Sequence, residues 1–129
     1  MALTAARVLA ITDRCTCCHA KVRAIVGVTV ADDAARFVPV SEIGSAIVRA
    51  ADPRELAARR IAPLRQRSGI PGGYHSNGCL KCDALVGRLR LERLLDRHLA
   101  GGGTYAQLDA GIELELALEP AAAPLRRIA

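Results

Sequence analysis

Apolar residues in the first part of the chain follow the spacing of β-strands. The run Arg7–Thr12 is short and mostly apolar, and Val22–Val30 is rich in β-branched residues, so both are predicted to be strands. Phe37–Val40 is predicted to be a further short extended piece, which Pro39 places at an edge or a turn. The N-terminal part of the chain is therefore expected to contribute a β-sheet.

The pattern then changes to the period of a helix. In Ser41–Ala51 the apolar residues Ile43, Ile47 and Val48 fall on one helical face, and Ser41 is the expected N-cap. These features predict an amphipathic helix directly after the extended segments.

A second helix is predicted to begin at Asp52. The Asp52 carboxylate can cap the helix, Pro53 suits the first helical position, and Glu55 can reach back to the cap. The helix is expected to end before Pro63. The two helices together form a predicted helical insertion over residues 41–62.

The second half of the chain mixes loops, strands and one helix. Glycine and proline residues predict a loop or irregular hairpin arm over 65–78. Leu85–Leu91 alternates as a strand would, Glu92–Ala100 reads as a helix closed by Gly101–Gly103, and Ile112–Leu118 alternates as a half-exposed strand.

Length and composition favour one domain with an aliphatic core. The chain has 129 residues, of which 51% are hydrophobic but only three are aromatic. We expect a single domain over 1–119, followed by a flexible tail over 120–129. The N-terminus has no signal-peptide core, and no apolar stretch is long enough for a membrane span, so a cytoplasmic protein is expected.

Four of the five cysteines form two C-x-x-C pairs. Each pair can turn two thiolates towards one point, and four thiolates make the tetrahedral shell that structural Zn²⁺ prefers. The two pairs share the longer pattern C-x-x-C-x-A, and a strand-like segment follows each. The sequence therefore predicts one structural Zn²⁺ bound by Cys15, Cys18, Cys79 and Cys82.

This arrangement predicts an α+β fold with zinc-ribbon-like β-hairpins. Each hairpin carries one C-x-x-C knuckle, with the two-helix insertion between the knuckles and a helix and strand at the C-terminal end. Sixty residues separate Cys18 from Cys79, against about 15–20 in the usual ribbon pattern. The insertion accounts for much of the excess, and loop-closure entropy rises only slowly with length.

Other uses of the cysteines are weighed against structural zinc. A redox C-x-x-C pair usually lies where a strand meets a helix N-terminus, and the cysteine spacing does not match that of common iron–sulfur proteins. Cys17 is expected to be a small, semi-buried residue, with a free thiol or an alternative ligand as the other interpretations. His19 and His75 lie near the pairs, and whether either replaces a cysteine is left open.

The second knuckle carries a resemblance to a known group. Tyr74–Gly87 reads Tyr-x-x-Asn-x-Cys-x-x-Cys-x-Ala-x-x-Gly and resembles a poorly characterised family of bacterial zinc-ribbon-like proteins with paired C-x-x-C knuckles. The resemblance covers residues 13–98. It implies metal ligation by the same four cysteines and implies no established activity. The chain departs from the family in having Cys17 and few aromatic residues after the second knuckle.

Charge and residue types narrow the function classes. No nucleophile has a recognisable base partner and no paired carboxylates suggest catalysis, so we expect a binding module rather than an enzyme, with no small-molecule substrate identified. The net charge of +5 and the arginine-rich segment 54–97 are compatible with nucleic acid as a partner, although a solvated basic face is the commoner outcome of such a charge distribution. The alternatives are a protein-interaction or self-associating scaffold domain, which would use the strand Ile112–Leu118, and a thiol-redox protein. The expected phosphate contacts are Arg59, Arg60, Arg65, Arg67, Lys81 and Arg88.

Overall fold

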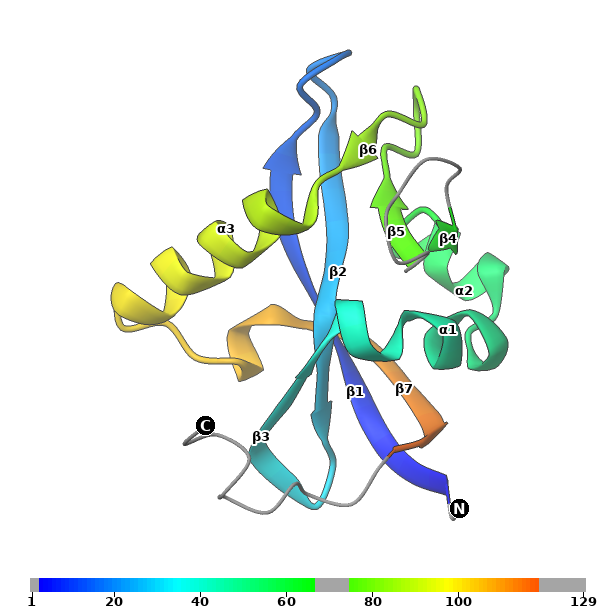
Figure 1. Ribbon diagram of the computed structural model, residues 1–129, viewed down its shortest axis with the longest axis vertical. Helices are drawn as coiled ribbons and strands as arrows, with labels where there is room; N and C mark the ends of the chain where they lie inside the picture. Colours follow the sequence, from blue (N-terminus) through cyan, green and yellow to red (C-terminus); the bar gives the residue numbers. More distant parts are fainter. Residues whose placement is uncertain (1–2, 67–74, 119–129) are drawn as a thin grey trace.

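The computed structural model of the chain describes residues 3–66 and 75–118. Its largest element is a four-stranded antiparallel sheet with the strand order β3-β2-β1-β7 (Figure 1). The strands are β1 (Leu3–Arg14), β2 (Lys21–Val30), β3 (Asp33–Pro39) and β7 (Asp109–Ala117).

A second, smaller sheet and three helices complete the described part. The small antiparallel sheet has the order β4-β5-β6, and a short 3₁₀ helix, η2, precedes β7. The bounds are α1 (Val40–Ala50), α2 (Pro53–Ala58), β4 (Arg65–Gln66), β5 (His75–Gly78), β6 (Leu85–Val86), α3 (Arg88–Ala100) and η2 (Ala106–Leu108). The α+β prediction is confirmed, including the two-helix insertion and the C-terminal helix and strand.

The four-stranded sheet has a separate apolar core on each face. Along β1, Val8 belongs to the first core and Leu9 to the second, as the alternation of side chains in a strand requires. In β2 the register shifts between Gly27 and Ile25, and Val26 is the additional residue of this β-bulge. The bulge places Val26 in the second core and Val28 in the first.

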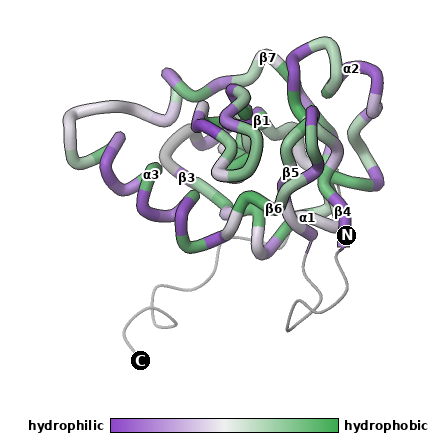
Figure 2. The backbone as a smooth tube through the Cα atoms, turned by 90° about the horizontal axis from the view of Figure 1, so that it is seen from above, coloured by the Kyte–Doolittle hydropathy of each residue, from purple (hydrophilic) through white to green (hydrophobic). Residues whose placement is uncertain are grey.

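Different helices cover the two faces. The first core joins the sheet to α1 and α2 through Ile43, Ile47 and Leu56. The second core joins it to α3 through Leu91 and Leu95, and it also contains cysteines of both knuckles. Hydrophilic and hydrophobic segments alternate along α3, which has one face against the sheet and the other in solvent (Figure 2).

The predicted helix starts are correct in one case and wrong in another. The Asp52 side chain accepts a hydrogen bond from the Arg54 N–H (2.9 Å), so it caps α2 as expected. Ser41 is not an N-cap, because α1 begins one residue earlier and its N-cap is Pro39, which makes no side-chain capping bond. Helix α2 ends at Ala58, well before the proline at position 63.

The prediction of a strand over Leu85–Leu91 is also wrong. Only Leu85–Val86 is a strand, and α3 begins at Arg88 after Gly87 as its N-cap. A short window of alternating leucines also matches a helix, because leucines four positions apart share a helical face. Here Leu91 and its neighbour one turn later are buried, whereas Leu89 is 61% exposed.

Other expectations are confirmed or lie outside the described residues. The hairpin arm expected over 65–78 contains β4 and β5, and the extended segment ending at Pro39 forms the sheet edge. The expected flexible tail, 120–129, lies outside the described residues. Among the described helices, none has the length and apolar character needed to cross a membrane.

Candidate metal centre

The two C-x-x-C pairs occupy equivalent turns of two β-hairpins. The first turn connects β1 with β2, and the second connects β5 with β6. In the first, the Cys15 N–H donates to the Ala20 carbonyl oxygen (2.8 Å); in the second, the Cys79 N–H donates to the Ala84 carbonyl oxygen (2.9 Å). The shared C-x-x-C-x-A pattern therefore corresponds to a shared hydrogen bond that closes each turn.

The backbone of the two turns also agrees at the residue after the second cysteine. His19 donates its N–H to the Cys15 carbonyl oxygen (3.0 Å), and Asp83 donates its N–H to the Cys79 carbonyl oxygen (2.8 Å). Both residues are left-handed with a φ of 63°. The two knuckles are thus the same local structure built twice from different side chains.

The four cysteine sulfurs converge between the hairpins. The Sγ atoms of Cys15 and Cys82 are 3.5 Å apart, those of Cys18 and Cys79 are 3.6 Å apart, and all four lie within 4.8 Å of one another. A tetrahedral zinc with Zn–S bonds of about 2.3 Å separates its sulfurs by about 3.8 Å. All four side chains are free cysteines, so the donor set fits a tetrahedral metal ion.

The turns already favour thiolate on the first cysteine of each pair. Hydrogen bonds from the N–H groups of Cys18 and Cys17 to Cys15 Sγ (3.5 and 3.4 Å) lower the pKa of Cys15 to about 6. The N–H of Cys82 likewise lowers the pKa of Cys79. These N–H groups offset part of the negative charge that a set of metal-binding thiolates carries.

The fourth thiol has the opposite tendency. The Ala84 N–H bonds to Cys82 and lowers its pKa, but local desolvation and the neighbouring sulfurs of Cys15, Cys18 and Cys79 together outweigh this bond and raise the pKa of Cys82 to about 12. Thiolates this close repel one another. A divalent cation among them would remove that repulsion, so the arrangement suits a bound metal better than four free thiols.

The centre is anchored in the protein on one side and open on the other. Cys15 and Cys79 are 5% and 2% exposed and belong to the second core. Cys18 is half-buried and Cys82 is exposed. The first cysteine of each knuckle thus attaches the centre to the core beneath α3, and the second faces outwards.

A buried asparagine attaches the second hairpin to the main sheet. Asn77 lies in β5, two residues before Cys79, and is 2% exposed. Its side-chain oxygen accepts from the Ile25 N–H (2.7 Å), and its side-chain amide donates to the Ile25 carbonyl oxygen (2.8 Å). The resemblance motif contains this asparagine, but the sequence does not reveal its partner in β2.

An ion pair attaches α3 beside the first knuckle. Arg90, in the first turn of α3, bonds to both carboxylate oxygens of Asp13 at the end of β1, one of them at 2.9 Å. Its hydrogen bond lowers the pKa of Asp13 below the usual value. The sequence did not predict this contact, because it joins positions that are far apart in the chain.

The remaining residues near the pairs lie outside the sulfur cluster. Among the described residues, the metal-binding group contains the four cysteines and no histidine, so neither His19 nor His75 belongs to it. His75 packs in β5 against α1 near Gly44. The expectation that Cys17 is semi-buried is wrong, because its side chain is exposed. Its backbone N–H donates a hydrogen bond to Cys15 Sγ.

The expected phosphate-contact residues are dispersed over several elements. Arg59 and Arg60 follow α2, and Lys81 lies exposed in the second knuckle. Arg65 in β4 forms an ion pair with Asp83, and Arg88 at the start of α3 lies 3.6 Å from Glu92. The remaining residue of the set, Arg67, lies outside the described residues.

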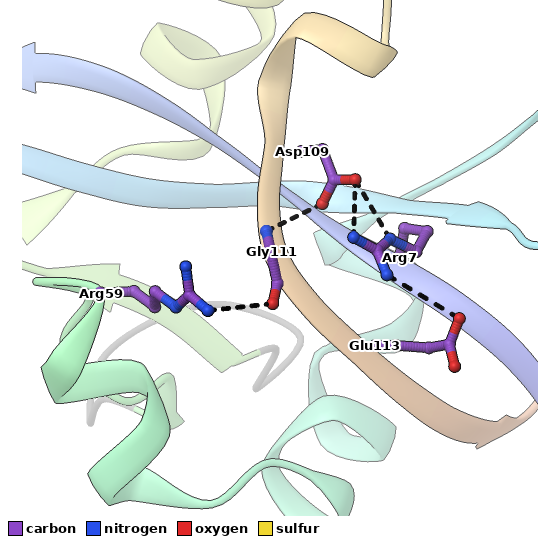
Figure 3. Close-up of polar contacts among 5 residues, drawn as sticks. All are labelled: Arg7, Arg59, Asp109, Gly111 and Glu113. Atoms are coloured by element: carbon purple, nitrogen blue, oxygen red, sulfur yellow. Dashed lines mark hydrogen bonds and ion pairs between the residues drawn. The ribbon is translucent and has the colours of Figure 1, made fainter.

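Two arginines contact the acidic strand β7, and one of them neutralises part of its charge. Arg7 of β1 contacts Asp109 (2.9 Å) and Glu113 (3.9 Å), and Arg59 donates to the Gly111 carbonyl oxygen (3.4 Å) (Figure 3). Arg59 therefore has a structural contact between α2 and the sheet edge, which reduces its availability for a nucleic acid.

No family model, curated protein or solved structure matches the chain. A metal ion at the four cysteines is therefore inferred from their geometry.

Proposed function

We propose that the protein is a small binding module whose fold is stabilised by one structural Zn²⁺, held by Cys15, Cys18, Cys79 and Cys82. The observation that carries the proposal is the convergence of four sulfurs from two hairpins with identical turn hydrogen bonds. The zinc would fix the small sheet to the large one. The resemblance of the second knuckle to bacterial zinc-ribbon-like proteins supports the same metal.

The surroundings of the pairs favour structural zinc over thiol redox chemistry. Both pairs lie in turns between strands, and neither lies at a helix N-terminus. Four thiolates complete a tetrahedral shell and leave no position for water or substrate. The role we propose is therefore binding rather than catalysis.

Metal analysis of the full chain tests the zinc centre. We expect one zinc per chain, and we expect Cys15→Ser and Cys82→Ser to lose the metal together with folding, because structural zinc supplies folding free energy. Cys17→Ser is the matched control, since its thiol lies outside the sulfur cluster, and it should keep both metal and fold.

Two results would refute this centre. One is a metal-free protein that unfolds at the same denaturant concentration with and without a chelator. The other is an equal loss of zinc in Cys17→Ser and Cys82→Ser. Absorption bands of an iron–sulfur cluster in the purified protein would contradict zinc as the metal while supporting the four cysteines as ligands.

For the partner, we propose nucleic acid contacted through Arg60 and Lys81. Both side chains are exposed, and within 3–66 and 75–118 neither has a charged or hydrogen-bonding partner, unlike Arg65. Binding to DNA or RNA should weaken steeply with salt, because each phosphate contact releases counterions. Lys81→Glu and Arg60→Glu should reduce the affinity several-fold, and Arg49→Glu on α1 is the control. Binding that ignores salt and these substitutions would contradict the proposal.

Self-association through β7 is less well supported. The strand is an edge of the described sheet, and its exposed face carries Glu113 and Glu115. Two antiparallel copies of β7 would bring these like charges close together, which opposes pairing. Sedimentation of the full chain is expected to show a monomer.

A further inference from the structure

A small apolar groove lies on the face of the sheet opposite α1 and α2. It has a volume of about 250 Å³ and runs between α3, the end of β3 and the start of α1. Apolar side chains form most of its lining: Val26, Phe37, Leu91, Leu95, Leu99 and Tyr105.

Two of the three aromatic residues in the chain meet in this groove. The rings of Phe37 and Tyr105 are stacked, with centroids 4.9 Å apart and planes 4° from parallel. Both side chains remain half-buried. A cavity of this size is below the range of about 300–1,000 Å³ typical of small-molecule sites, so it suits one or two apolar side chains of a peptide.

The rim of the groove is acidic. Glu92 and Asp96 lie one turn apart on α3 and line the groove, and Arg88 lines it one turn before them. Arg88 is 3.6 Å from Glu92 and neutralises part of that charge. Asp96 has no partner within the part of the chain that the structure describes. The rim therefore favours a segment that carries apolar and basic residues together.

We propose that this groove binds the C-terminal segment of the same chain, Leu125-Arg126-Arg127-Ile128. The segment lies outside the described residues. Its leucine and isoleucine supply apolar side chains for the groove, and its two arginines supply charge opposite to that of Asp96 and Glu92. The protein would then cover its own apolar face through apolar contacts and opposite charge.

The chain between β7 and the segment is long enough. Leu114 of β7 pairs with Ala6 of β1, and Ala6 pairs with Val30 of β2, so Leu114 and Val30 lie at the same level of the sheet. Phe37 of β3 pairs with Thr29, the residue before Val30, and therefore lies level with the residue before Leu114. Phe37 is thus three strands away from Leu118 across the sheet and five residues away along the strand direction, a distance of about 22 Å at usual strand spacing and rise. Ten extended residues span about 33 Å, enough to bring the end of the segment into the groove.

The test is nuclear Overhauser contact in the zinc-loaded full chain at low concentration. We expect methyl groups of Leu125 or Ile128 to contact the rings of Tyr105 and Phe37. Substituting Leu125→Ser together with Ile128→Ser should remove these contacts and shift the ring signals. The matched control, Ala121→Ser with Ala123→Ser, changes the same tail without its apolar side chains and should leave the signals unchanged.

Charge provides an independent arm of the test. Asp96→Arg should abolish the contacts, and Arg126→Glu with Arg127→Glu in the same chain should restore them, whereas Glu55→Arg on α2 should have no effect. Absence of the contacts, or unchanged ring signals in the serine variant, overturns the proposal. Contacts found only between labelled and unlabelled copies also overturn it, because the segment would then bind a second molecule.

Discussion

The side chain of Asn77 occupies the place of a neighbouring strand beside Ile25. It accepts from the Ile25 N–H and donates to the Ile25 carbonyl oxygen, as a backbone partner would. Strand β3 pairs with β2 only from Gly27 to Val30, so the edge of β2 is not covered by β3 at Ile25. One buried amide thus satisfies this edge and sets the distance between the two knuckle hairpins.

Replacing Asn77 with alanine should destabilise the protein by about 2–4 kcal/mol. The substitution removes two hydrogen bonds and leaves the buried N–H and carbonyl groups of Ile25 unsatisfied. Urea unfolding of the zinc-loaded protein measures the change. Ser76→Ala is the control on the same strand, since Ser76 makes one long bond to the Arg65 carbonyl oxygen (3.4 Å). Equal effects of the two substitutions would contradict the role of Asn77.

The Asp13–Arg90 pair should contribute about 1 kcal/mol of coupling free energy. Asp13 is mostly shielded, with its side chain 11% exposed, whereas Arg90 is half-exposed, so the value lies between those of buried and surface pairs. A double-mutant cycle with Asp13→Asn and Arg90→Gln measures it. The exposed pair Arg88–Glu92 serves as the comparison and should give less than about 0.5 kcal/mol. A coupling free energy for Asp13–Arg90 smaller than that for Arg88–Glu92 would show that the Asp13–Arg90 pair does not attach α3 to β1.

Adding a methyl group at Gly27 should destabilise the protein by about 3 kcal/mol. A Cβ there would lie 2.3 Å from the Val38 carbonyl oxygen and 2.7 Å from the Phe37 ring, so β3 would have to move. Gly87→Ala is the control, because a Cβ at that position meets no atom within 4 Å. Thermal unfolding of the two variants checks this. A Gly27→Ala protein as stable as the control would show that β3 adapts freely.

Glycine at position 19 should stabilise the first knuckle by about 0.5 kcal/mol. His19 has a φ of 63°, a conformation that is unfavourable for a residue with a Cβ, and the gain is partly offset by the flexibility of glycine in the unfolded chain. His19→Val should instead destabilise the protein by about 1–2 kcal/mol, since a β-branched residue fits this conformation poorly. Both are read from unfolding with zinc present. Destabilisation by His19→Gly together with stabilisation by His19→Val would contradict a left-handed conformation at this position.

The cluster of four cysteines was predictable from the sequence because its information is local. A C-x-x-C spacing specifies a turn, and the repetition of C-x-x-C-x-A around Cys15 and Cys79 indicated two equivalent turns. The capping of α2 by Asp52 is similarly local, since its partner is the N–H of Arg54. Local patterns therefore predicted both the cysteines that come together and one helix start.

Contacts between distant residues could not be predicted in this way. The partner of Asn77 depends on where β3 stops pairing with β2, and the stacking of Phe37 on Tyr105 depends on how α3 packs. The strand predicted over Leu85–Leu91 was wrong because alternation over so few residues does not distinguish a strand from the start of a helix. In each case the deciding interactions come from packing that one sequence does not display.

The separation of the two knuckles has a consequence for synthesis of the protein. Sixty residues lie between Cys18 and Cys79, so the first pair leaves the ribosome well before the second exists. At about 5–20 residues per second, the nascent chain waits roughly 3–12 s with an incomplete set of thiolates. During that interval the proposed zinc would have only the two thiolates of the first pair and would be held loosely, and the β1–β2 hairpin must remain soluble until residue 82 completes the set of four cysteines.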